Sequence, residues 1–224
     1  MTNLIDIENL GKRYDDFALA GANLAVEPGC VVGFIGSNGA GKTTTLKAAL
    51  GLIAPDEGTV RLFGQAVTPG SSALDDLKSR IGVVLDTCAF PSTCRVGDAG
   101  LIGRAAYATW DASHFSRLLS TFGLSPKKKV SELSRGMGMK LTLAFALAHH
   151  PELLVLDEAT AGLDPIARDE VLDILRDFVA EGDRGILMST HITSDLEKIA
   201  DEIVCVDNGR IMFAAPKDVL TDEA

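Results

Sequence analysis

Residues 36–43 read G-S-N-G-A-G-K-T, and this stretch limits the possible folds more than any other part of the chain. It fits the phosphate-binding pattern G-x-x-x-x-G-K-[ST]. The apolar run 31–35 (V-V-G-F-I) comes directly before it and predicts a buried strand, and residues 43–50 can form a helix. Strand, glycine-rich loop and helix in this order are the context in which the pattern binds phosphate. The sequence therefore favours an α/β fold over a chance glycine-rich turn.

The residue types in this loop suit a phosphate ligand. The glycines permit unusual backbone angles and close approach of a ligand, while successive N–H groups and a helix N-terminus attract an anion. Lys42 adds a charge that can reach the β- and γ-phosphates, and the hydroxyl of Thr43 can bind Mg²⁺. We predict that the binding residues of the loop are Gly36, Ser37, Asn38, Gly39, Ala40, Gly41, Lys42, Thr43 and Thr44.

A pair of carboxylates follows a second apolar run. Residues 153–156 (L-L-V-L) predict a strand at the centre of a parallel sheet, and Asp157 and Glu158 come directly after it. Ligands of open α/β sheets bind at the carboxyl ends of the strands, so these side chains should lie beside the phosphate loop. Asp157 can then bind Mg²⁺, and Glu158 can orient or deprotonate an attacking water. Alone, the pair would more often be two solvated acids.

Two further segments show polar residues in informative places. Residues 133–137 (L-S-R-G-M) precede an apolar helical stretch, where Ser134 suits the N-cap position and the helix N-terminus attracts an anion. In isolation, an ordinary capped helix is the more common explanation. His191 follows the buried run 185–189, again at the ligand edge of the sheet, although a lone histidine there is more often structural.

Composition excludes some classes of partner and site. The formal net charge is −10, which disfavours sequence-independent binding to nucleic acid. The one basic run, 127–129, is more simply a solvated loop or helix start. Four cysteines show no metal-ligand spacing, so we expect reduced thiols. No apolar run approaches the roughly 18 residues of a membrane span.

Taken together, these motifs resemble those of the nucleotide-binding subunit of an ATP-binding cassette (ABC) transporter. The resemblance covers nearly the whole chain, with every motif in the family's order. In it, 36–43 is the Walker A loop, 153–157 is Walker B, 133–137 is the signature motif and 161–164 is the D-loop. It implies an α/β fold with a phosphate-loop core, an antiparallel β subdomain at the N-terminus and a helical subdomain over 87–150, within one domain over 1–224.

The resemblance also implies roles for single residues. Glu158 is the catalytic glutamate and His191 the switch histidine, and both act with Lys42 in ATP hydrolysis. Tyr14 falls where the family stacks an aromatic ring on adenine. ATP and Mg²⁺ are the implied ligands. In a head-to-tail dimer, Ser134 and Gly136 of one subunit would contact the γ-phosphate held by the other.

The implied partners and location follow from the same resemblance. We expect a homodimer, or a heterodimer with another ABC ATPase subunit, and a separate transmembrane permease. The protein would be cytoplasmic and peripheral on the inner face of the cell membrane. No nucleic acid is expected as a partner.

Two positions depart from the family pattern. Arg135 and Met137 replace a glycine and a glutamine of the L-S-G-G-Q signature, so a polar contact is lost while the serine cap can persist. Asp86 stands where the family places a glutamine near Mg²⁺, and its carboxylate could approach the ion through water. The expected metal ligands are thus Thr43, Asp157 and Asp86. Both departures resemble bacterial exporter-type cassettes, which favours export.

Two other functions fit parts of the sequence. One is a soluble ABC-type ATPase that is not coupled to transport; such cassettes usually occur in tandem or with long coiled-coil inserts, and neither is present here. The other is a phosphate-loop kinase or GTPase, against which Tyr14 and the Ser134 segment argue. The transported substrate is not encoded in these motifs, because its contacts lie in the permease.

Overall fold

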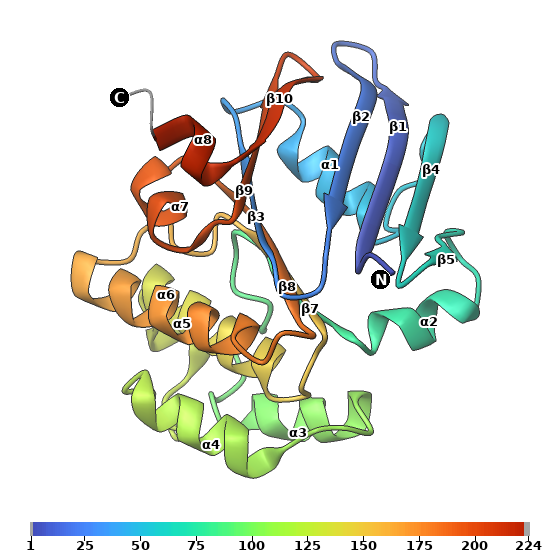
Figure 1. Cartoon of the computed structure of the whole chain (residues 1–224). Coiled ribbons are helices and arrows are strands. Elements are labelled where there is room, and N and C mark those ends of the chain that lie inside the picture. The colour runs from blue at the N-terminus through green and yellow to red at the C-terminus, as the bar shows by residue number, and fades with distance from the viewer. Residues whose placement is uncertain (1, 222–224) are drawn as a thin grey trace.

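The structure of the protein is a computed structural model that describes residues 2–221. Residues 1 and 222–224, which the predicted 1–224 domain includes, lie outside the described residues. The chain forms two sheets with helices around them (Figure 1). This mixed arrangement confirms the predicted α/β fold class.

A six-stranded sheet has the order β10-β9-β3-β8-β7-β6. Its strands pair in parallel except for β10, which returns antiparallel to β9 through a turn at Asn208-Gly209, where both residues have positive φ. The strands are β3 (Val31–Ile35), β6 (Ile81–Val84), β7 (Leu153–Asp157), β8 (Gly185–Thr190), β9 (Glu202–Asp207) and β10 (Arg210–Pro216). Strands β3, β7 and β8 match the apolar runs from which they are predicted.

The second sheet is antiparallel, with the order β2-β1-β4-β5, as predicted for the N-terminal part of the chain. Its central strand places Ile5 opposite Val26 on one side and Leu62 on the other. The strands are β1 (Ile5–Arg13), β2 (Ala18–Val26), β4 (Glu57–Leu62) and β5 (Gln65–Ala66). Apolar residues of this sheet share one core with α1 (Lys42–Ala49) and one face of the large sheet.

Strand β7 shows why the two sheets and the helices stack in layers. All five of its residues are buried. Leu153 and Val155 belong to the core shared with α1, whereas Leu154 and Leu156 belong to the core on the opposite face, with α5 (Arg135–Leu147) and α6 (Pro165–Val179). A strand covered on both faces has a continuous apolar sequence, which is how this one was predictable.

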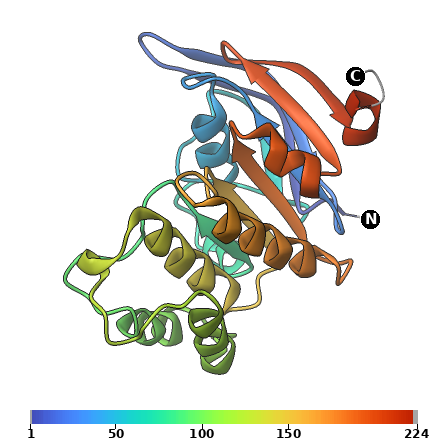
Figure 2. The ribbon, with the colours of Figure 1, turned by 90° about the vertical axis from the view of Figure 1, so that its left-hand side faces the viewer.

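Helices dominate the segment between β6 and β7. Three helices, α3 (Asp98–Ala106), α4 (Ala112–Thr121) and α5, lie within residues 87–150, where a helical subdomain is expected, and a short 3₁₀ helix, η1 (Val130–Glu132), precedes α5. This region projects to one side of the sheets (Figure 2). The division of 87–150 as a subdomain of its own stays a prediction.

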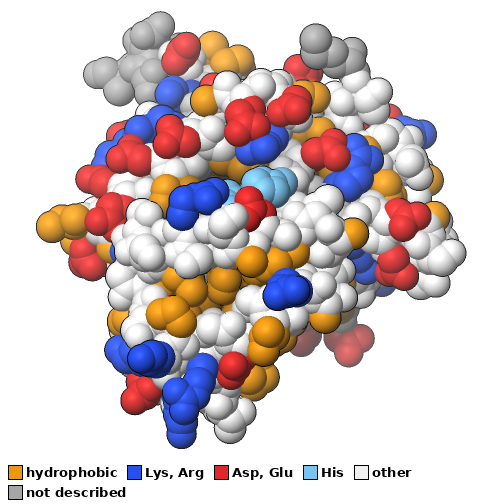
Figure 3. Space-filling model, turned by 90° about the horizontal axis from the view of Figure 1, so that it is seen from below, with side chains coloured by type: hydrophobic (Ala, Val, Ile, Leu, Met, Phe, Trp, Pro, Cys, Tyr) orange, Lys and Arg blue, Asp and Glu red, His pale blue; other side chains and the backbone are white. Residues whose placement is uncertain are grey.

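Part of this helical region has an apolar surface. Figure 3 looks from below, the end where Figure 1 places α3 and α4, and shows hydrophobic side chains gathered among basic ones. On α3, Leu101 and Ile102 are 67% and 43% exposed. Exposed apolar patches of this kind are typical of surfaces that contact another protein.

The remaining helices are α2 (Ala73–Lys78), α7 (Thr193–Ile199) and α8 (Lys217–Thr221). Helix α7 has seven residues of mixed polarity, and no sequence pattern singles it out. Helix α6 begins with Pro165, whose missing N–H costs nothing at a first helical position, and the Asp164 carboxylate accepts a hydrogen bond of 3.0 Å from the amide of Ala167. Helix α7 directly follows the end of β8 and so lies at the ligand edge of the sheet.

Candidate active site

The glycine-rich loop joins β3 to α1, as predicted. At Gly36, an added Cβ would lie 2.2 Å from the carbonyl oxygen of Val206, so no other residue fits without a backbone shift. Gly39 and Gly41 have φ values of 82° and 115°, in a region that side chains disfavour. The sequence of the loop is therefore set by its backbone path, and Ala40 closes it with an amide hydrogen bond of 3.1 Å to the carbonyl of Ser37.

Lys42 places its charge inside this loop. Its side chain is 7% exposed, and its ammonium donates hydrogen bonds of 2.7 and 3.2 Å to the carbonyls of Gly36 and Ser37. The same nitrogen lies 3.9 Å from Oε1 of Glu158. The carbonyl oxygens hold the buried ammonium in place beside the N–H groups of the loop. Together the charge and the N–H groups form a fixed binding site for a phosphate.

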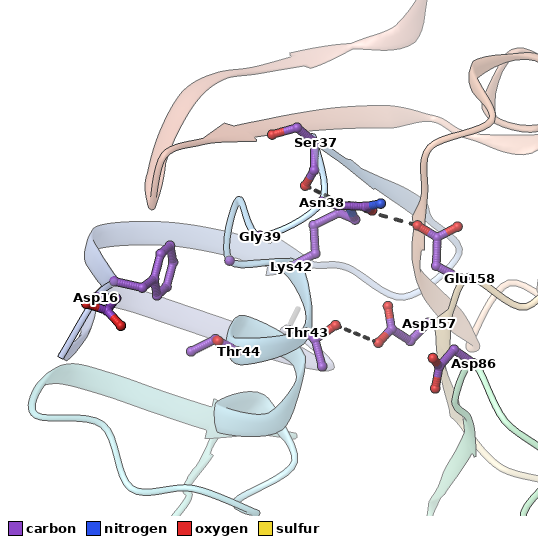
Figure 4. Close-up of a pocket in the computed structure, with 12 residues that line it drawn as sticks. Asp16, Ser37, Asn38, Gly39, Lys42, Thr43, Thr44, Asp86, Asp157 and Glu158 are labelled. Carbon is purple, nitrogen blue, oxygen red and sulfur yellow. Dashed lines mark hydrogen bonds and ion pairs between the residues drawn. The ribbon is translucent and has the colours of Figure 1, made fainter. Parts of the chain in front are cut away.

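A pocket of about 560 Å³ opens in front of the loop, a volume within the usual range for small-molecule sites. Figure 4 shows its residues converging from the loop, from the start of α1 and from the end of β7. The lining residues are Asp16, Phe17, Ser37, Asn38, Gly39, Gly41, Lys42, Thr43, Thr44, Asp86, Asp157 and Glu158. All of them except Asp16 and Phe17 are residues that the sequence predicts to bind nucleotide or metal or to act on water.

The donors for a metal ion lie at one end of this pocket. The hydroxyl of Thr43 donates a hydrogen bond of 2.9 Å to Oδ2 of Asp157, and the hydroxyl of Ser189 donates to Oδ1. The Asp157 carboxylate is 4% exposed. A hydroxyl and a buried carboxylate are oxygen ligands that Mg²⁺ prefers, and their placement beside the phosphate loop fits the ion. Within residues 2–221, no group of three or more acidic, histidine or cysteine side chains is arranged to hold a metal ion.

Glu158 and His191 meet at the same end. Nδ1 of His191 lies 2.7 Å from Oε2 of Glu158, and the amide of Glu158 donates 3.0 Å to the carbonyl of Ser189. Glu158 has a φ of 54°, a conformation uncommon for a residue with a side chain. This turn directs its carboxylate toward Lys42 (Figure 4). The structure thus brings together three residues that lie far apart in the sequence.

The aromatic wall of the pocket differs from the sequence-based expectation. Phe17 and Asp16 line the pocket, whereas Tyr14 does not. Tyr14 is 49% exposed, and its ring centroid lies 6.5 Å from that of Phe17. A tight turn, closed by the amide of Tyr14 and the carbonyl of Phe17 at 2.7 Å, directs Phe17 toward Gly41. From the sequence, the one indication that Phe17 lines the pocket is its aromatic side chain.

Ser134 and Gly136 lie outside the pocket of their own chain. Ser134 is the N-cap of α5, and its hydroxyl accepts 3.2 Å from the amide of Met137. Gly136 packs on the loop after β7, where an added Cβ would lie 2.9 Å from Cδ2 of Leu163. Arg135 lies over Gly162 of the same loop. A contact of Ser134 with nucleotide therefore requires a second subunit.

Comparison with known proteins decides the family. The family model described as "ABC transporter" matches residues 19–161. This chain belongs to the ABC transporter family. Nod factor export ATP-binding protein I of Burkholderia lata is 39% identical over 98% of the chain and 73% of the relative. Bacitracin transport ATP-binding protein BcrA of Bacillus licheniformis is 33% identical over 98% of the chain and 72% of the relative.

A solved ATP-binding subunit of an ABC transporter has the same fold as this one. It superposes with a TM-score of 0.87 at 27% identity, over 98% of this chain and 92% of the other. The chain is thus an ABC ATPase that binds and hydrolyses ATP, which confirms the predicted family and enzyme class and sets aside the kinase or GTPase alternative. No helix formed by residues 2–221 has the length and apolar character needed to span a membrane.

Proposed function

We propose that this ABC ATPase energises a bacterial exporter through a separate permease and that Glu158 and His191 carry out the chemical step. The observation that carries the proposal is the convergence of Lys42, Glu158 and His191 at one end of the pocket. Export is supported by the relatives, whose names refer to Nod factor export and bacitracin transport.

In this proposal, the glycine-rich loop and Lys42 bind the phosphates of ATP. Thr43 and Asp157 would hold Mg²⁺, and Asp86, in the same pocket, would reach it through water. When bound, the ion supplies positive charge to the β- and γ-phosphates. Tyr14 stays the proposed stacking partner of adenine; its ring centroid lies 6.5 Å from that of Phe17, the aromatic residue that lines the pocket.

Glu158 is the group that accepts a proton from the attacking water. Its Oε2 is fixed by His191 at 2.7 Å, while Oε1 faces Lys42 at 3.9 Å, where the γ-phosphate would bind. A carboxylate fixed at one oxygen can orient a water with the other without rearranging, which lowers the cost of reaching the transition state. His191 keeps this orientation from the neighbouring strand end.

Two copies, or this chain and a related subunit, complete each site. Ser134 and Gly136 at the N-terminus of one α5 would contact the γ-phosphate bound by the other subunit, since they lie outside their own pocket. The helical region over 87–150, with exposed Leu101 and Ile102, would contact the permease. The protein would then act in the cytoplasm, on the inner face of the membrane.

Replacing Glu158 with glutamine tests the chemical role. Glu158→Gln keeps the shape and the hydrogen-bonding oxygen but cannot accept the proton, so we expect phosphate release to fall roughly 100- to 10,000-fold. ATP affinity, measured by calorimetry, should stay near that of the wild type. Glu170→Gln, on the exposed side of α6, is the matched control. Phosphate release near the wild-type rate would exclude Glu158 as the base.

Membrane fractionation tests the coupling to transport. If a separate permease is the partner, the protein should pellet with membranes only when that permease is co-expressed. A protein that stays in the supernatant under both conditions, while it hydrolyses ATP, would instead support the alternative of a soluble ABC-type ATPase.

A further inference from the structure

Asp195 is a buried carboxylate that ATP binding does not use. Among the acidic side chains of residues 2–221, two are buried, Asp157 at 4% exposure and Asp195 at 1%. Asp157 faces the pocket, whereas Asp195 lies in the first turn of α7 and does not line it. A charge that is removed from water without a ligand requires compensating contacts, so its partners indicate what it does.

Three segments meet at Asp195. The hydroxyl of Thr160, which is fully buried, donates 2.6 Å to Oδ2. On the other side, Nε of Arg168 lies 3.9 Å from Oδ1, and its Nη2 donates 3.4 Å to the carbonyl of Leu163. The Thr160–Asp195–Arg168 network thus connects the loop after β7, the first turn of α6 and the first turn of α7.

These segments carry the two residues of the proposed chemical step. Thr160 lies two positions after Glu158, and Asp195 lies four positions after His191. The left-handed backbone at Glu158, with a φ of 54°, persists only where surrounding contacts hold it. The hydrogen bond between Thr160 and Asp195 therefore joins the loop that carries Glu158 to the helix that follows His191. Glu158 and His191 are themselves in contact at 2.7 Å.

The pair formed by Asp195 and Arg168 is not fully closed. Oδ1 of Asp195 and Nε of Arg168 are both buried, and neither has a hydrogen-bond partner. The side chain of Arg168 is 25% exposed, so water screens this contact less than it would at the surface. Thr160 makes a hydrogen bond of 2.6 Å to Oδ2 of Asp195, whereas Arg168 stays 3.9 Å from Oδ1. The contact with Thr160 is therefore the stronger of the two.

We propose that Thr160 and Asp195 are positioning residues for ATP hydrolysis: through their hydrogen bond they fix the Glu158–His191 pair in its catalytic geometry. The inference rests on the proposed roles of Glu158 and His191. Neither residue contacts the nucleotide pocket, so their loss should lower turnover and leave ATP binding intact. If these residues only stabilised the fold, their loss would lower turnover and ATP binding alike, because less protein would be folded.

Thr160→Val tests this, because valine keeps the shape and removes the hydroxyl. We expect kcat to fall about ten- to hundredfold, the usual range when a partner behind a reacting group is lost, with ATP affinity and KM within about twofold of wild type. Thr160→Ser restores the hydroxyl and should recover most of kcat. Asp173→Asn, which removes an exposed acid paired with Arg176 on α6, should leave kcat unchanged.

A double-mutant cycle sharpens the test. Asp195→Asn weakens the same connection, so Thr160→Val combined with Asp195→Asn should lower kcat by less than the product of the single effects. Additive losses would overturn the proposal, as would wild-type kcat in Thr160→Val or equal losses in Thr160→Val and Thr160→Ser. A fall in kcat matched by equal falls in ATP affinity and melting temperature would also overturn it.

The outcome for Glu158→Gln separates this inference from the proposed function. An inactive Glu158→Gln together with a fully active Thr160→Val would refute the positioning role alone. A fully active Glu158→Gln would refute the role of Glu158, whatever the Thr160 variants show.

Discussion

In the six-stranded sheet, the edge formed by the carboxyl ends of the parallel strands and the edge formed by their amino ends differ in how far their charged side chains are exposed. At the edge where β3 and β7 end, Lys42 and Asp157 are 7% and 4% exposed and lie against the phosphate loop. At the opposite edge, where β6 and β7 begin, Arg80 and Glu152 form an ion pair with side chains 37% and 43% exposed. Charged side chains are thus buried at the carboxyl edge and partly exposed to water at the amino edge.

This difference separates binding from stability. Burying a charge costs several kcal/mol unless partners compensate for it, so a fold keeps such charges mainly where a ligand will use them. At the opposite edge the buried titratable group is His149, which is 1% exposed and whose pKa burial lowers to about 4. It is neutral near pH 7 and needs no counter-charge. We therefore expect substitutions at the first edge to affect ATP hydrolysis and those at the second to affect stability alone.

Lys42→Ala should give the largest effect of this comparison. The variant loses a buried charge that is directed at the phosphates, and we expect kcat/KM for ATP to fall roughly a thousandfold, about 4 kcal/mol of transition-state stabilisation. Steady-state phosphate release measures this. Lys47→Ala, an exposed lysine in the last turn of the same helix, is the control and should behave as wild type. Equal effects in the two variants would remove the distinction between buried and exposed charge.

The residues at the ligand edge were predictable because each follows a recognisable stretch of sequence. The phosphate loop is contiguous, and Glu158 and His191 come directly after apolar runs that form β7 and β8. Since parallel strands end at a shared edge, sequence order alone predicts that these side chains meet. The structure places Glu158 and His191 in contact at 2.7 Å, but their roles stay predictions.

Other parts of the site had no local signal. That Phe17 rather than Tyr14 lines the pocket depends on a turn that redirects the chain by a single hydrogen bond. The contact between Thr160 and Asp195 joins residues 35 positions apart, and helix α7 that carries Asp195 is too short to show a helical period. Such contacts depend on how strand ends are placed in space, which a sequence pattern does not specify.

His149 tests the second edge through pH. Because its folded pKa of about 4 lies below the unfolded value near 6.5, the unfolded chain takes up the proton first as pH falls. Stability is therefore complete above about pH 6.5, and up to about 3 kcal/mol is lost as pH falls toward 4. Denaturant unfolding at several pH values should show this loss.

A phenylalanine at this position isolates the contribution of the buried ring. His149→Phe keeps a ring to stack on Tyr107, whose centroid lies 3.9 Å away, and should flatten the pH dependence. His150→Gln, at the exposed neighbour, should retain it. An NMR titration midpoint for His149 near 6.5, or an unchanged slope in His149→Phe, would show that burial does not keep this ring neutral.

The ion pair between Arg80 and Glu152 should show the smallest effect. Two hydrogen bonds of 2.6 Å join the side chains and lower the pKa of Glu152, yet both remain open to water, so we expect Glu152→Gln to cost at most about 1 kcal/mol. Urea unfolding near pH 7 measures this difference, which should shrink at high salt because the charges are exposed. Because the pKa of Glu152 is lower in the folded than in the unfolded protein, its ionised form adds stability. This stability is lost as pH falls below 4.5, the ordinary pKa of a glutamate. ATP turnover should remain at the wild-type rate. A clear loss of kcat in Glu152→Gln would show that the two edges are coupled, and would contradict the separation of binding from stability inferred from the burial of their charges.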